Sequence, residues 1–92
     1  MAYKITQRQK TNAQKLGVTI RTSSNSSKKL DVFRQGKKIA EIGASGYMDY
    51  DLYLKAEGKE YADKRRRLYK LRHESNRHKR GTPGFYADKI LW

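Results

Sequence analysis

The sequence predicts a small α+β domain with a basic N-terminal arm or helix, in which a β-hairpin or three-stranded sheet is packed by two or three helices. Three observations support this. The chain has 92 residues, enough for one small domain. Only 36% of them are hydrophobic, so the core must be thin. Short β-branched runs in the first half give way to helical spacing in the second.

The first predicted element is a short helix over residues 7–16. Thr6 and Gln9 have the spacing of a capping box, and Gly17 stands where a helix commonly ends. The first turn of this helix carries Arg8 instead of the acids that the helix dipole favours. We therefore expect the helix to need a partner surface.

A strand and a linker follow this helix. Residues 18–20 are all β-branched and predict a strand, whereas residues 22–27 are Ser, Thr and Asn and predict a polar linker that would be flexible in isolation. On this basis the chain divides into a basic arm of helix, strand and linker over residues 1–28 and an α+β domain over residues 29–92.

A hairpin is predicted next, over residues 30–42. Leu30 and Val32 alternate with polar residues before the turn at Gln35 and Gly36, and residues 39–42 carry the apolar positions after it. A two-stranded hairpin is not stable alone, so the following helices must cover it.

Three helical segments complete the domain. Asp49 begins a short turn that Gly58 ends, residues 59–73 have the best helical spacing, and residues 83–91 follow an N-cap and a proline. Trp92 either fills the domain's own core, which we favour, or docks in a neighbouring protein.

Charge is concentrated at both ends of the chain. The net charge of +13 divides into +7 over residues 1–30, −2 over residues 31–63 and +8 over residues 64–92. Blocks of one sign repel themselves and usually serve as interaction segments. No run of about 18 apolar residues is present, so no membrane span is expected.

The strongest functional signal is the cationic segment of residues 64–80, which holds nine Lys and Arg against the single acid Glu74. Arginine suits phosphate and carboxylate because its guanidinium is planar and bidentate. The plainer alternative is a solvated helix whose arginine stems cover a small core. We predict contact with a polyanion or an acidic protein through Lys64, Arg65, Arg66, Arg67, Lys70, Arg72, Arg77, Lys79 and Arg80, and through Arg8, Lys10 and Lys15 in the arm.

No pattern of residues indicates an active site. Tyr47, Tyr50 and Tyr53 recur at intervals of three, but the neighbouring aspartates favour packing over stacking on nucleic-acid bases. His73 and His78 lie five residues apart, a spacing that does not place them on one helix face, and the chain has no cysteine. We expect no catalytic residue, metal or cofactor.

Several segments together resemble a known family. They are KLDVF at residues 29–33, GKKI at 36–39, IGASGYMDY at 42–50, RRLYKLRH at 66–73 and GTPGFYADKILW at 81–92. Their order and spacing are similar to those of a small basic protein family of large DNA viruses, with members in giant algal-type viruses and some bacteriophages. That family shares a Tyr-x-x-Arg-His element and a closing Leu-Trp. The resemblance covers roughly residues 28–92, and it implies a viral source but no catalytic residues.

These observations favour a non-enzymatic virion protein. We expect a minor capsid or capsid-associated component, located in the virion, that docks electrostatically on viral coat proteins, on packaged genome or on both. A second class is a sequence-nonspecific nucleic-acid-binding protein that condenses the genome or assists its handling. A third is a subunit of a ribonucleoprotein.

Overall fold

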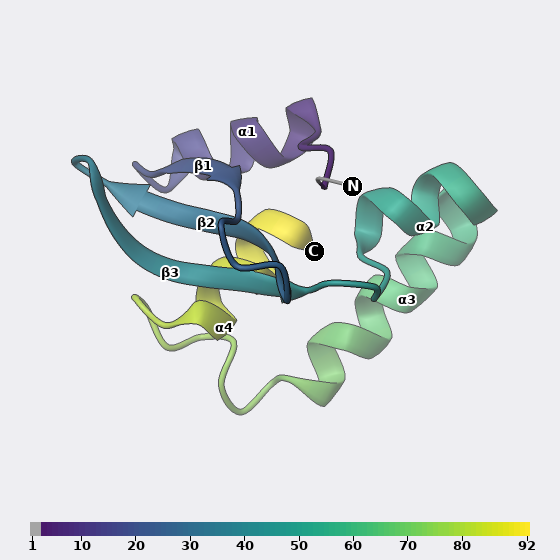
Figure 1. Cartoon of the computed structure of the whole chain (residues 1–92). Coiled ribbons are helices and arrows are strands. Elements are labelled where there is room, and N and C mark those ends of the chain that lie inside the picture. The colour runs from purple at the N-terminus through teal and green to yellow at the C-terminus, as the bar shows by residue number, and fades with distance from the viewer. Residues whose placement is uncertain (1–2) are drawn as a thin grey trace.

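The structure is a computed structural model that describes residues 3–92 (Figure 1). Its three strands form one antiparallel sheet in the order β1-β2-β3, which together with the helices confirms the α+β class. None of the helices in residues 3–92 combines the length and the apolar character needed to cross a membrane. The elements are α1 (Gln7–Lys15), β1 (Thr19–Thr22), β2 (Lys28–Arg34), β3 (Lys37–Ala44), α2 (Tyr50–Glu57), α3 (Lys59–Arg72), α4 (Pro83–Tyr86) and the π-helical turn η1 (Ala87–Leu91).

The β2–β3 hairpin forms where the sequence predicts it. Gln35 and Gly36 both adopt positive φ, 51° and 78°, as a tight turn between twisted strands requires. In the hairpin register Leu30 lies opposite Ile42, and both are buried. The register shifts just beyond Val32, at the irregularity between Val32 and Phe33. On β3, the side chains of Ala40 and Ile42 are buried in the core, whereas that of Ile39 is only partly buried.

The N-terminal helix is capped as predicted. Gln9 donates its backbone N–H to the Thr6 hydroxyl (3.2 Å), and the Gln9 side chain accepts from the Thr6 backbone (3.0 Å). The partner surface that this helix needs is the domain itself, because Ala13 of α1 and Val18 lie in the same core cluster as Leu30. The packing therefore crosses the boundary expected between residues 28 and 29.

The Ser-rich segment predicted to be a linker connects β1 to β2, and hydrogen bonds to Asp31 hold it against the sheet. The buried Asp31 carboxylate accepts hydrogen bonds from the Ser23 hydroxyl (2.6 Å) and the Ser24 backbone (3.2 Å). Burial raises the pKa of Asp31, but these hydrogen bonds and Lys38 outweigh it and hold the pKa below its ordinary 3.8. The serines are thus donors to a buried charge.

The C-terminal segment completes the core on the sheet. Thr82 caps α4 by accepting from the Phe85 backbone (3.3 Å), and Pro83 occupies the first turn as predicted. The buried side chains of α4 and η1 pack with those of the sheet and α1. They are Phe85, Tyr86, Ile90 and Leu91.

Helices α2 and α3 form a hairpin around Gly58 that extends to one side of the sheet (Figure 1). Asp49 caps α2 by accepting from the Leu52 backbone (3.1 Å). Trp92 ties this hairpin to the core, because its ring stacks on Tyr69 of α3 at a centroid distance of 4.4 Å and an angle of 11°. Of the two possibilities for Trp92, packing within its own domain is the one observed.

Candidate anion-binding surface

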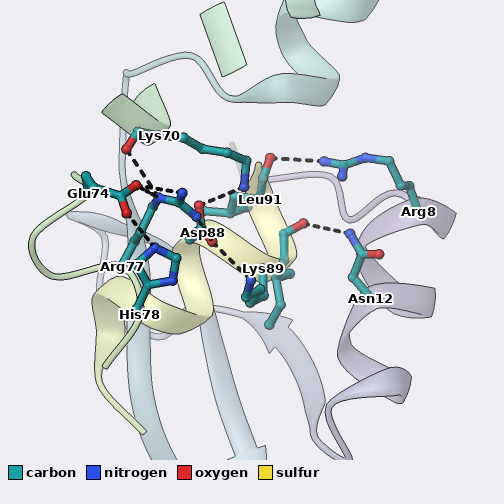
Figure 2. Close-up of polar contacts among 10 residues, drawn as sticks. Arg8, Asn12, Lys70, Glu74, Arg77, His78, Asp88, Lys89 and Leu91 are labelled. Atoms are coloured by element: carbon teal, nitrogen blue, oxygen red, sulfur yellow. Dashed lines mark hydrogen bonds and ion pairs between the residues drawn. The ribbon is translucent and has the colours of Figure 1, made fainter. Parts of the chain in front are cut away.

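Three basic side chains surround one buried carboxylate, Asp88 of η1, which has no solvent exposure (Figure 2). Lys70 Nζ lies 2.8 Å from its Oδ1, while Arg77 and Lys89 approach its Oδ2 to 3.5 Å and 3.6 Å. A buried carboxylate is costly unless it is paired. Two residues predicted to contact a partner, Lys70 and Arg77, therefore attach α3 and the following loop to the C-terminal segment.

Arg77 has further internal partners. Its Nε donates to the Lys70 carbonyl (3.2 Å), and its Nε and Nη2 reach Glu74 Oε1 at 3.0 Å and 2.7 Å. Glu74 also contacts His78 (2.9 Å), and the hydrogen bonds from Arg77 and His78 hold the pKa of the Glu74 carboxyl below its ordinary value. Each of the three guanidinium nitrogens of Arg77 thus has a partner within the chain.

Arg8 is also engaged internally. Its Nε donates to Asp51 of α2 (2.8 Å), and its Nη2 donates to the Leu91 carbonyl (3.0 Å; Figure 2). Asn12, one turn along α1, donates to the Ile90 carbonyl (3.4 Å). Arg8 therefore joins three elements that are distant in the sequence.

Arg65 and Arg66 lie half-buried over tyrosine rings. The Arg66 guanidinium is 3.6 Å from the Tyr50 ring centroid, and that of Arg65 is 5.3 Å from the ring of Tyr53. Tyr50 is buried, and the hydrogen bond from its hydroxyl to Asp63 (2.8 Å) raises its pKa. Packing is thus the role of Tyr50, as expected. It is not the role of Tyr47, whose side chain is 73% exposed.

The remaining predicted contact residues are exposed, and none lies within 4.0 Å of a carboxylate in residues 3–92. Five of them lie on α3 or in the loop that comes after it, and two lie on α1. Their charges face solvent, as a surface that receives a polyanion requires. They are Lys64, Arg67, Arg72, Lys79 and Arg80, and Lys10 and Lys15.

Across residues 3–92 the cations likewise divide into those with an acidic partner and those without one. Seven of the nine carboxylates form ion pairs with seven Lys or Arg, which leaves 15 of the 22 cationic side chains without an acidic partner in residues 3–92. Sequence reasoning missed six of these because they lie outside the long basic run, in the segment before α1, on the strands and on α2. They are Lys4, Arg21, Lys28, Arg34, Lys37 and Lys55.

The two histidines have separate surroundings. His78 lies beside Glu74, while the His73 ring packs against Tyr69 at a centroid distance of 4.4 Å. Within residues 3–92 no three His, Cys, Asp or Glu side chains are grouped so that they could hold a metal ion.

Comparisons with protein-family models, with curated proteins and with solved structures gave no match. The interpretation of the surface therefore rests on the geometry of its charges. That geometry separates cations with internal partners, such as Lys70, from cations that face solvent, such as Arg67.

Proposed function

We propose that this chain is a non-enzymatic virion component that docks electrostatically on the phosphate backbone of packaged nucleic acid. The observation that carries the proposal is the set of 15 cationic side chains without an acidic partner in residues 3–92. Most of the chain's acids are already used in internal pairs, so the excess positive charge repels itself in the free protein. A polyanion relieves that repulsion and releases its own counterions.

The exposed cations of α3 and its following loop form the main contact. Lys64 and Arg67 are three residues apart and therefore lie on one side of α3, and Arg72 stands at its last turn. Lys79 and Arg80 continue the basic surface beyond the helix. Contacts of this kind bind phosphate and position the protein, but they do not read base sequence.

The virion setting comes from the family resemblance over residues 28–92. In that setting coat proteins are the other available partner, and an acidic patch on a coat protein would meet the same cations. We favour nucleic acid because the cations are distributed over α1, the strands and α3, which suits a long regular polyanion better than one local acidic patch.

Salt dependence tests the proposal. The expected result is binding to a fluorescent DNA duplex that weakens steeply between about 50 mM and about 200 mM salt, without regard to base sequence. Lys64→Gln combined with Arg67→Gln should reduce the slope of log affinity against log salt by about 2, since each phosphate contact contributes about 1. Lys55→Gln, an exposed unpaired cation on α2, is the control for charge.

Absence of DNA binding at about 50 mM salt would exclude the genome-docking role, as would an affinity that does not change with salt. A comparison of purified genome-containing and genome-free particles then distinguishes docking on the genome from docking on coat proteins. Docking on genome predicts that the protein is lost from genome-free particles, whereas docking on coat proteins predicts that it remains in them.

A further inference from the structure

A cleft of about 350 Å³ lies where three distant parts of the chain meet. The end of α1, the end of β2 and the loop before α4 form its walls, and the side chains of α4 form its floor. The lining residues are Lys15, Leu16, Arg34, Arg80, Gly81, Phe85 and Tyr86. The cleft therefore exists only in the folded chain, because residues 15, 34 and 80 are far apart in sequence.

Three cations line this cleft and no carboxylate does. Lys15, Arg34 and Arg80 are all exposed, and none has an ion-pair partner in residues 3–92. Positive charges that converge on a concave surface with a buried apolar floor focus the electrostatic potential there. An anion is the ligand that such a site attracts.

Arg34 is held in place at the cleft by the fold. Its Nη2 lies 3.4 Å from both the Leu16 carbonyl oxygen and the Tyr86 hydroxyl oxygen. These long contacts orient the guanidinium while its other N–H groups remain without partners in residues 3–92. A donor that is oriented before binding loses less freedom when the ligand arrives.

Arg80 reaches the cleft from the loop between α3 and α4. Its guanidinium lies 5.7 Å from the ring centroid of Phe85, which is buried beneath it. Two arginines and one lysine thus border one small space. Arginine binds phosphate oxygens in a bidentate manner, and lysine adds a mobile point charge.

We propose that this cleft seats one phosphate group of a nucleic acid. The inference rests on the proposed function for the source of the phosphate, and it adds a defined site to a diffuse basic surface. An internal phosphodiester and a terminal phosphate share the chemistry that the cleft recognises. The terminal group carries more charge, so it is the better ligand wherever it reaches the cleft.

Nuclear magnetic resonance on the full-length ¹⁵N-labelled chain tests the site with inorganic phosphate as the probe. We expect the amide signals of Gly17, Arg34 and Gly81 to shift in a saturable manner, since they lie in the cleft or beside it. Arg34→Gln should weaken phosphate binding about tenfold, the loss expected when a charge-assisted hydrogen bond is removed. Arg80→Gln, on an exposed loop, is the second variant if Arg34→Gln fails to fold.

Lys37→Gln is the matched control. Lys37 is exposed, lies three residues beyond Arg34, has no ion pair in residues 3–92 and does not line the cleft. If Arg34→Gln and Lys37→Gln weaken phosphate binding equally, or if the shifts avoid the cleft, the site is refuted. That result leaves the wider proposal intact, because DNA binding at low salt is measured separately.

Oligonucleotides of one sequence, with and without a 5′-phosphate, then identify the source of the phosphate. Tighter binding of the phosphorylated form, removed by Arg34→Gln, supports a terminal phosphate. Equal binding of both forms that Arg34→Gln weakens more than Lys37→Gln supports the backbone. Saturable phosphate shifts in the cleft without any DNA binding would support an anion site and overturn its assignment to nucleic acid.

Discussion

Asp88→Asn keeps the size of the side chain but removes the negative charge around which Lys70, Arg77 and Lys89 gather. The amide can still accept a hydrogen bond from Lys70, so the substitution isolates the electrostatic part of the contact. Since Asp88 is fully buried, the three cations lose an acceptor charge that water cannot replace at that position.

The expected loss of stability follows from burial. Removing one member of a buried ion pair costs about 3–5 kcal/mol. The Lys70 and Lys89 side chains are 30% and 42% exposed and so recover part of their solvation, while Arg77 keeps Glu74 as an ionic partner. We therefore expect the lower end, about 3 kcal/mol. For a domain of this size that corresponds to a fall in Tm of more than about 10 °C.

Urea unfolding measures this loss directly. Trp92 is the one tryptophan in the sequence, and it stacks on Tyr69, so its fluorescence reports the docking of the C-terminal segment on α3. Glu57→Gln, an exposed acid without an ion pair in residues 3–92, is the control and should change stability by less than about 0.5 kcal/mol. A similarly small change for Asp88→Asn would refute the structural role given to this cluster.

Two further predictions concern the sheet. Gly43→Ala should lower the free energy of unfolding in urea more than Gly36→Ala does. Both glycines have positive φ, so an alanine at either position is strained by about 1–2 kcal/mol. At residue 43 the new Cβ would also lie 2.9 Å from Leu91 Cδ1, whereas residue 36 faces open space. Equal losses would mean that Leu91 moves aside freely. The lowered pKa of Asp31 stabilises the fold above the unfolded-state pKa, and this contribution is lost as the pH falls through the folded-state value, so Asp31→Asn should flatten the stability profile below about pH 4. An unchanged slope in acid unfolding would count against the Ser23 and Ser24 hydrogen bonds.

The elements that the sequence predicted well are those fixed by neighbouring residues. The Thr6–Gln9 capping box, the Gln35–Gly36 turn and the Thr82–Pro83 helix start each depend on contacts within a few residues. The N-terminal arm was predicted to be separate because no residue near α1 in the sequence indicates which residues Arg8 contacts. Those partners, Asp51 and Leu91, are 43 and 83 residues from Arg8.

The roles of the cations were less predictable for the same reason. Lys64 and Lys70 look alike in the basic run, yet Lys70 faces a buried carboxylate 18 residues away and Lys64 faces solvent. Arg34 reads as an ordinary strand residue, and only the fold brings it beside Lys15 and Arg80. Charge sums locate a basic segment, whereas tertiary structure decides which of its members remain available.

The contacts of Arg8 and Asn12 with the carbonyls of Leu91 and Ile90 also constrain the order of folding. The nine-residue α1 has no acid in its first turn and is too short to persist alone, so it stays largely unformed until residues 90 and 91 arrive. The chain must lose the entropy of bringing residues 8 and 91 together before it gains the burial of α1 against η1, and this slows folding. We expect the nascent chain to leave the apolar side chains of Ala13 and Val18 uncovered until residues 90 and 91 are available to pack with them.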